Sequence, residues 1–441
     1  MKALFPRVLL LDASVLQWNR LSEEWLGPAW ELGKAADVAL TSEPVSVVAN
    51  AALKKNAHEY HSVGPYWWPD PGKPPEGLPY VWKPGQVNPD RKNRGDYLNL
   101  KNVVCSVSTL SLAYWFTRNE TYAMHAATLM KVWYLDEKTR MLPHLDFAQE
   151  IPGKRKGRGD GIIDTDGQPH LLDAVALLEG SVHWTPEDHS LLQDWSSEFL
   201  NWLRTSRNGR EENDHVNNHG IQFDVQVATY ALFVGKNDIA LNIFKALPRR
   251  RIYTQIDPDG SQPFELTRDK SWDYACLSTL RFAQVASLAL NLGFDLWTYE
   301  TPDGRGIKKA IDFLIPFANG ESPWPYPQST PFNPRKLIVS LYLAARHFDT
   351  DTTQYYANAA RHIIHHANIT VKKCSPVSWW ALPGIASPLA HLKVTGTHLD
   401  DLKESGRGCY FTGDKFAYSS SAVIKKVVNN ASGPAVLSTF S

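Results

Sequence analysis

The sequence contains little cysteine and has no excess of charge of either sign. Among its 441 residues are 4 cysteines, and Lys+Arg and Asp+Glu each number 46, so the formal net charge is zero. No two cysteines are spaced as Cys-x-x-Cys, which excludes a zinc ribbon and a thioredoxin-like redox site. A balanced charge argues against a general nucleic-acid binder, but it allows a local basic patch for an anionic ligand.

Long apolar runs are also missing. No stretch of about 18 apolar residues occurs, so the sequence predicts no membrane-spanning helix. Near the N-terminus only the short run Val8–Leu11 is apolar before Asp12, which is too short for the core of a signal peptide. The sequence therefore predicts no membrane association and shows no export signal.

Aromatic residues, in contrast, are abundant. The chain has 16 Trp, 17 Tyr and 17 Phe, and this number of tryptophans exceeds what core packing needs. A common place for surplus tryptophan is a surface that binds sugars. The other classes are ordinary for a globular protein, with 43% hydrophobic and 21% charged residues.

The hydrophobic pattern is helical over most of the chain. Leu98–Phe116 and Tyr122–Tyr134 repeat apolar residues at spacings of three and four, and Thr185-Pro186 is a strong helix start. No repeat of fixed period occurs, which excludes a TPR or HEAT array. We expect a mainly α protein, an incomplete α/α toroid built as a barrel of antiparallel helix pairs. The alternative that the pattern leaves open is an irregular helical domain. Further helices are predicted near 186–203, 221–235, 238–247, 272–293, 307–318, 334–348 and 353–366.

Two segments depart from this pattern. Residues 61–97 are irregular and rich in Pro, Gly and aromatics, and a loop of this length is usually functional. Residues 371–441 mix short β-like runs with Gly, Ser and Lys, which predicts a small C-terminal appendage of mixed or β character.

Two polar stretches could carry chemistry. Eight polar residues lie within 213–224, where an apolar helix begins, whereas a helix cap needs only one of them. Farther on, Arg268 and Tyr274 are six residues apart, so they can converge only if Arg268 lies in a loop and Tyr274 in the first helical turn. A cation beside a phenol lowers its pKa, which would suit a proton shuttle. The alternative is a core tyrosine and an unrelated surface arginine.

Asn218-His219 followed by Arg268 and Tyr274 resembles the catalytic set of α/α-toroid polysaccharide lyases of the alginate lyase type. The order and spacing most resemble polysaccharide lyase family 38, and more distantly family 5, over about residues 45–350. The other stretches that are similar to this group are Gly64–Pro71, Leu78-Pro79-Tyr80, Asn88-Pro89, Phe147-Ala148-Gln149 and Gly161-Ile162-Ile163-Asp164.

The resemblance implies β-elimination on a 4-linked polyuronate such as polymannuronate, alginate or glucuronan, without a metal or other cofactor. Asn218, His219 and Arg268 would neutralise the C6 carboxylate, and Tyr274 would transfer protons. For mannuronate and glucuronate one tyrosine could act as base and acid, whereas for guluronate His219 would be the base. The implied partner is an anionic polysaccharide. Such substrates lead us to expect an extracellular or periplasmic enzyme, although no leader is visible.

The resemblance also implies a domain organisation and substrate contacts. Residues 1–370 would form the catalytic domain, with 61–97 as its substrate loop. Leu142 stands where the group leads us to expect Asn before Pro143, which leaves the preferred uronan open. The substrate-binding candidates are Tyr66, Trp67, Trp68, Arg94, Gln149, Arg158 and Asn217; one of the two tryptophans could instead anchor the loop.

Two other functions remain open from the sequence. An α/α-toroid glycoside hydrolase would share the fold but would need two carboxylates about 6.5–9.5 Å apart for inversion. A non-catalytic carbohydrate-binding protein would keep the tryptophans without needing His219 or Tyr274. The carboxylates that could serve a hydrolase are Asp214, Asp224, Glu265 and Asp273.

Overall fold

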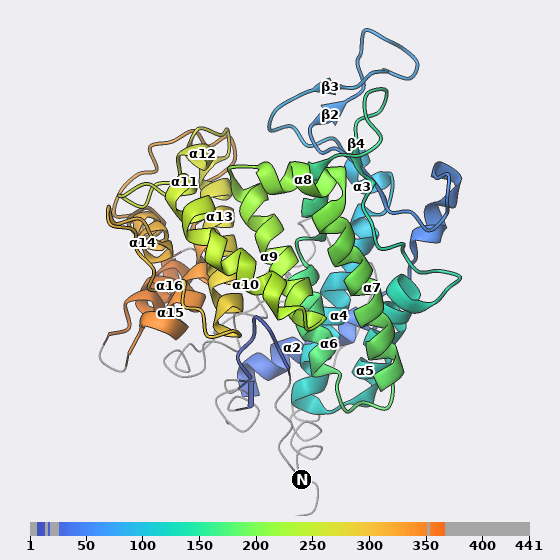
Figure 1. Ribbon diagram of the computed structural model, residues 1–441, viewed down its shortest axis with the longest axis horizontal. Coiled ribbons are helices and arrows are strands. Elements are labelled where there is room, and N and C mark those ends of the chain that lie inside the picture. The colour runs from blue at the N-terminus through green and yellow to red at the C-terminus, as the bar shows by residue number, and fades with distance from the viewer. Residues whose placement is uncertain (1–6, 14–15, 18–25, 351–352, 367–441) are drawn as a thin grey trace, which may run out of the picture.

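The structure is a computed structural model that describes residues 7–13, 16–17, 26–350 and 353–366. These residues form a mainly helical body with short strands at one end (Figure 1). Residues 371–441 lie outside the described residues, as do Cys374 and Cys409. Within the described part of the chain, no helix combines the length and the apolar character that crossing a bilayer requires.

One set of helices forms the inside of the body. Each member packs against the next along the set, and nearly all sides of the first four are buried. Every one of the ten residues of α6 is buried, for example. The inner helices are α4 (Tyr97–Thr117), α6 (Gln168–Leu177), α9 (Asn218–Phe233), α13 (Ser271–Leu290) and α15 (Ile338–Phe348).

A second set lies outside the first and buries only one face. These helices alternate with the inner ones along the chain, which gives the α/α toroid expected from the sequence. An apolar stripe with a polar opposite face is what such a position requires. The outer helices are α5 (Glu120–Met130), α7 (Pro186–Thr205), α10 (Asn237–Leu247), α14 (Ile307–Ala318) and α16 (Tyr355–His366).

Shorter elements complete the body. Helix α2 (Leu26–Ala39) packs against α4, and α8 (Arg207–Asp214) packs against α7 and α9. The remaining helical segments are η2 (Val47–Leu53), α3 (Asp90–Asn93), η3 (Lys131–Leu135), η4 (Gly159–Thr165), η5 (Pro248–Ile252), α11 (Tyr253–Gln255), α12 (Pro263–Leu266) and η6 (Pro334–Leu337).

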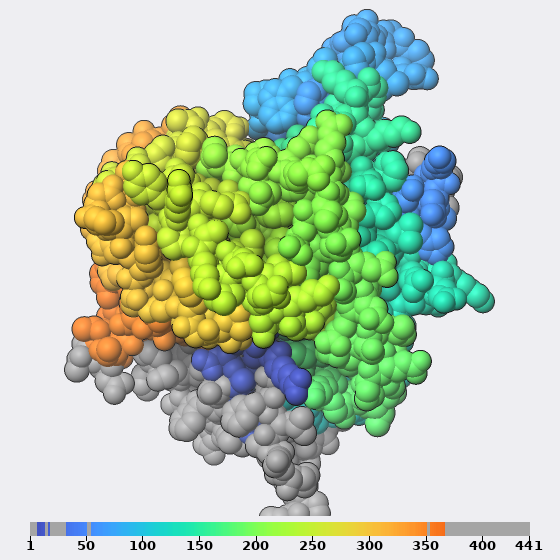
Figure 2. Space-filling model, in the orientation of Figure 1, coloured from blue at the N-terminus to red at the C-terminus, as the bar shows by residue number. Residues whose placement is uncertain are grey.

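The aromatic loop 61–97 contains three of the four strands among the described residues, and β4 lies farther along the chain. Strand β1 (His61–Val63) pairs in parallel with β4 (Phe147–Glu150), and β2 (Trp67–Trp68) pairs antiparallel with β3 (Val81–Trp82). In Figure 1 the β2–β3 hairpin stands out from one end of the helical body, and Figure 2 shows it rising above that end.

Inner helices begin at the end of the body that carries this loop. Asp96, at the start of α4, accepts a hydrogen bond of 2.9 Å from the backbone N–H of His61. Strand β4, the partner of β1, packs against η4, and η4 packs against α8 and α9. Because helix N-termini carry partial positive charge, this end of the body favours an anionic ligand.

The N-terminal segment is held against α6 by one buried carboxylate. Asp173 of α6 accepts hydrogen bonds from the backbone N–H groups of Leu9, Leu10 and Leu11, at 2.5, 2.9 and 2.8 Å. Burial raises the pKa of Asp173 to about 6, although these three bonds act against the shift. The stability of the N-terminal segment is therefore coupled to pH.

Candidate active site

The four predicted catalytic residues come from the starts of two neighbouring inner helices. Asn218 and His219 are the first residues of α9, and Tyr274 lies in the first turn of α13. Arg268 lies in the connection between α12 and α13, where the spacing required it to be. Helices α9 and α13 pack against each other, so the structure brings these residues together.

Tyr274 is held between a cation and a second phenol. The guanidinium carbon of Arg268 lies 3.3 Å from the centroid of the Tyr274 ring, and the hydroxyls of Tyr66 and Tyr274 are 2.8 Å apart. Burial raises the pKa of Tyr274, and the opposing effect of Arg268 does not offset it. The Arg268 guanidinium thus lowers the pKa of Tyr274, as expected. The net shift of this pKa is nevertheless upward, opposite to our prediction, because burial of the phenol has the larger effect.

His219 is oriented by a carboxylate that sequence reasoning missed. Its Nδ1 lies 2.7 Å from Oε1 of Glu212, a fully buried residue of α8. Burial disfavours the imidazolium, but the charge and hydrogen bond of Glu212, together with Asp160, outweigh it and raise the pKa of His219. Glu212 precedes the conspicuous polar run by one residue and lies within a helix, so only its burial marks it out.

A second buried carboxylate, Glu265, holds Asn218. Oε1 of Glu265 accepts from the backbone N–H of Asn218 at 2.5 Å, and its Oε2 accepts from Nδ2 of Asn218 at 2.9 Å. Oε2 also lies 3.5 Å from Nη1 of Arg268, so one carboxylate links two predicted site residues. Burial raises the pKa of Glu265, although Arg268 and Asn218 oppose the shift. The amide oxygen of Asn218 is buried and accepts no hydrogen bond from the described residues.

Gln149 and Arg158 belong to a buried polar network beside this group. Nη2 of Arg158 donates to Oε1 of Gln149 at 2.7 Å, and Nε2 of Gln149 donates to Asp164 at 3.1 Å. Asp164 also accepts from Arg91 at 2.9 Å. Gln149 has a φ of +51°, a left-handed backbone that a non-glycine residue adopts at a cost, so the network holds it under strain.

The aromatic side chains of the loop differ in burial and in the contacts that they make. The indole N–H of Trp67 is buried and makes no hydrogen bond within the described part of the chain, and Lys154 covers the ring at 4.6 Å. The indole of Trp68 donates to the backbone oxygen of Gln86 at 2.8 Å. Trp82, which sequence reasoning missed, is 47% exposed and packs edge-on against Tyr66 at 5.4 Å. Only Tyr66 among these residues contacts Tyr274 directly.

Two predicted substrate ligands are occupied by other contacts. Asn217 caps α9, because its side-chain oxygen accepts from the backbone N–H of His219 at 3.1 Å. Arg94 is exposed and donates to the hydroxyl of Tyr80 at 3.1 Å. The structure therefore gives Asn217 a structural role and ties Arg94 to the loop.

The carboxylates considered for a hydrolase are engaged elsewhere. Asp224 pairs with the buried Arg251 at 2.7 Å, and Asp273 pairs with Lys336 at 2.6 Å. Glu265 is bound by Asn218, and Asp214 is exposed at the end of α8.

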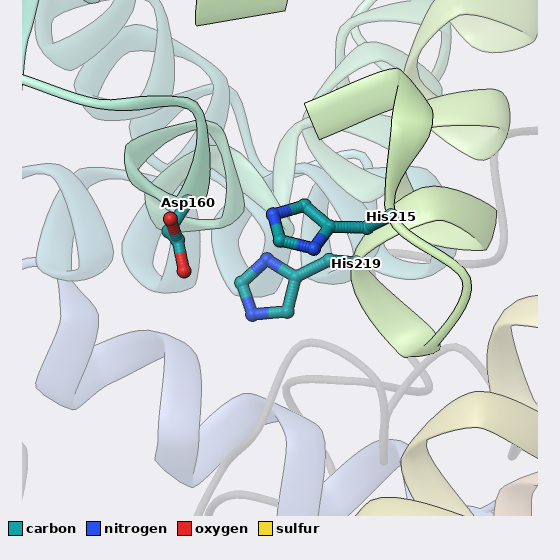
Figure 3. Close-up of side chains that lie close together, drawn as sticks. All are labelled: Asp160, His215 and His219. Atoms are coloured by element: carbon teal, nitrogen blue, oxygen red, sulfur yellow. The ribbon is translucent and has the colours of Figure 1, made fainter. Parts of the chain in front are cut away.

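A cluster of one carboxylate and two imidazoles also lies at this end of the helical body. Asp160, His215 and His219 each offer one ligand atom within 4.8 Å of the others. Figure 3 shows the two imidazole rings side by side with the Asp160 carboxylate facing them. They come from η4, from the residue after α8 and from the first turn of α9.

Comparison with known families identifies the class of this protein. Residues 47–324 match the alginate lyase family, which is more than half of the chain, so the chain belongs to that family. It is accordingly an enzyme, a polysaccharide lyase with the α/α-toroid fold.

Solved structures agree with this assignment. The chain is similar to the crystal structure of an alginate lyase from Bacteroides ovatus, with 35% identity and a TM-score of 0.77 over 81% of this chain and 96% of that chain. It shares the fold of alginate lyase A1-III from Sphingomonas species A1, with 16% identity and a TM-score of 0.50 over 81% and 94% of the two chains. Comparison with the curated proteins gives no match.

Proposed function

We propose that this enzyme cleaves a 4-linked polyuronate of the alginate type by β-elimination, and that it falls within polysaccharide lyase family 38. The relative from Bacteroides ovatus is an alginate lyase and is similar over most of both chains. The observation that carries the proposal is the position of Tyr274, whose ring lies under Arg268. Arg268 is in turn linked to Asn218 through the carboxylate of Glu265. Residues 1–370 would form the catalytic domain.

Elimination first requires that the charge of the substrate's C6 carboxylate be neutralised. Removing the C5 proton otherwise builds an enolate-like dianion, which preorganised donors must stabilise. Arg268 suits this task, because its side chain is 27% exposed and its Nη1, although 3.5 Å from Glu265, makes no hydrogen bond among the described residues. His219 supports it because Glu212 favours its charged form.

Asn218 contributes through Glu265. Its amide N–H groups are turned toward that carboxylate. Burial raises the pKa of Glu265, so the carboxyl accepts a proton more readily than usual. Glu265 thereby fixes the orientation of the Asn218 amide at the start of α9.

Proton transfer is assigned to Tyr274. A base must take the C5 proton and an acid must protonate the departing O4. The raised pKa of Tyr274 suits the acid directly, while its use as a base depends on Arg268 to hold the phenolate. In mannuronate and glucuronate both groups lie on one face and Tyr274 could serve both, whereas in guluronate His219 would be the base.

One assay tests the proposal. The protein is incubated with alginate, polymannuronate and glucuronan, and the ultraviolet absorbance of the C4–C5 double bond is followed beside the release of reducing ends. We expect both signals together, and His219→Ala should impair them severely. Reducing ends without absorbance would point to a hydrolase, and binding without either would point to a non-catalytic protein.

A further inference from the structure

We infer that Asp160, His215 and His219 form a binding site for a divalent transition-metal ion of the zinc type, and that the ion inhibits the enzyme by occupying His219. Two imidazoles and one carboxylate are a ligand set that zinc, nickel, copper and cobalt prefer over magnesium or calcium. The proposal that the ion binds stands on the cluster itself. The proposal that it inhibits rests on the function proposed above.

Spacing of the three ligands suits one ion. Their ligand atoms lie within 4.8 Å of one another, and ligands held tetrahedrally at about 2.1 Å from zinc are about 3.4 Å apart. The three side chains would therefore close by about 1.4 Å at most. Figure 3 shows the imidazole rings and the carboxylate facing a common space, so small side-chain rotations suffice.

Surrounding residues prepare the ligands for an ion. Glu212 binds Nδ1 of His219 at 2.7 Å, which leaves Nε2 as the ligating nitrogen. A buried carboxylate on the far nitrogen of a histidine is the usual support of a metal-bound imidazole. Oε2 of Glu212 is buried, accepts no hydrogen bond from any residue that the structure describes, and lies 3.7 Å from Nε2 of His215.

Charge and access also permit binding. Asp160 pairs with Arg158 through Oδ2 at 3.1 Å, so its other oxygen can face an ion. The carboxylate of Asp160 balances the positive charge of Arg158. At His219, the negative charges of Glu212 and Asp160 oppose the positive charge of Arg268. The side chains of Asp160 and His215 are 31% and 35% exposed, so an ion can enter from solvent without unfolding the site.

Binding is measured first, without substrate. The full chain is freed of metal with a chelator and titrated with Co²⁺, followed by its visible absorption, and with Zn²⁺, followed by calorimetry. We expect one equivalent to bind, and His215→Gln and Asp160→Asn to weaken the affinity by about 10–100-fold or more. Thermal unfolding of both variants checks that they are folded.

A matched variant tests whether removing a histidine outside the cluster affects binding. His183 precedes α7, at the end opposite to α8, and the 20 residues of α7 span about 30 Å. His183→Gln should bind Zn²⁺ as the wild type does. The proposed site would be overturned if the wild type did not bind the ion. It would also be overturned if His215→Gln and Asp160→Asn bound the ion with the same affinity as the wild type.

Inhibition is measured second. Zn²⁺ should inhibit the wild-type lyase reversibly, and the concentration for half inhibition should rise about tenfold or more in His215→Gln. If Zn²⁺ binds at the cluster but turnover is unchanged, the inhibitory role is wrong while the site stands. If no uronan is cleaved at all, the proposed function fails, and the binding measurement still decides the metal site.

Discussion

Replacing Tyr274 with Phe tests the proposed chemistry with little structural disturbance. The change removes one hydroxyl whose hydrogen-bond partner is the hydroxyl of Tyr66, 2.8 Å away. Phenylalanine keeps the ring on which the Arg268 guanidinium stacks at 3.3 Å, so the cation stays in place. Any large loss of activity must then come from the missing hydroxyl.

Its magnitude can be bounded from that geometry. Loss of one neutral hydrogen bond is worth about 0.5–1.5 kcal/mol, which corresponds to roughly tenfold in rate at most. Loss of a group that transfers protons in the transition state lowers kcat by about 10²–10⁴-fold. We therefore expect Tyr274→Phe to lower kcat by at least about 10²-fold, with substrate binding and thermal stability nearly unchanged.

Tyr66→Phe is the matched control, because it breaks the same hydrogen bond from the other side. It should cost about tenfold or less in kcat. The assay is the initial rate of double-bond formation on each polyuronate, with binding of the inactive variant measured by calorimetry. The reasoning is refuted if Tyr274→Phe retains activity within tenfold of wild type, or if both variants lose the same amount.

Three further outcomes are expected. Glu212→Gln, which removes the charge beside His219, should lower kcat by about 10–100-fold with KM little changed, and Glu212→Asp should recover part of the rate; equal losses in kcat and in folded protein would contradict a positioning role. The pKa of Asp173 is about 6 in the folded protein, against an ordinary value of 3.8. Between pH 3.8 and 6 the folded protein therefore keeps a proton on Asp173 that the unfolded chain releases. The stabilisation from this proton is present in full below about pH 4 and is lost as the pH rises through about 6. Relative to Asp173→Asn, the wild type should lose about 3 kcal/mol over this range, and thermal unfolding of both proteins at several pH values that shows a constant difference would disprove it. Gly220→Ala would place a Cβ 2.0 Å from the backbone oxygen of His215, so it should lower stability by about 1–3 kcal/mol and also lower activity. Gly33→Ala should be neutral or stabilising in the same unfolding assay, because its Cβ would meet no described atom within 4 Å outside its own helix backbone and chain neighbours.

Helices with one apolar face were predictable from the sequence, and helices buried on all sides were harder to find. The outer helix α14 was predicted at residues 307–318, the range that it occupies. The capping box at Thr185 and Asp188 likewise marks the start of α7. Helix α6 was missed, because all ten of its residues are buried and no polar face reveals the helical period.

The same physical distinction explains the site. Asn218, His219, Arg268 and Tyr274 stand in a recognisable order along the chain, and the structure places them together at the starts of α9 and α13. The shift in the pKa of Tyr274 was predicted with the wrong sign, because a sequence shows which charge can be near a phenol but not how deeply the phenol is buried.

Glu212 was not predicted as part of the site, and Glu265 was considered only as a carboxylate for a hydrolase, because the role of each comes entirely from burial. In solvent each would be an ordinary acidic residue on a short helix. At 0% and 1% exposure each must find a partner, because an isolated buried charge is costly. The partners they find are His219 and Asn218, and this pairing sets the orientation of both. Under the proposed function, two buried acids therefore fix His219 and Asn218 at the place that would take an anionic substrate.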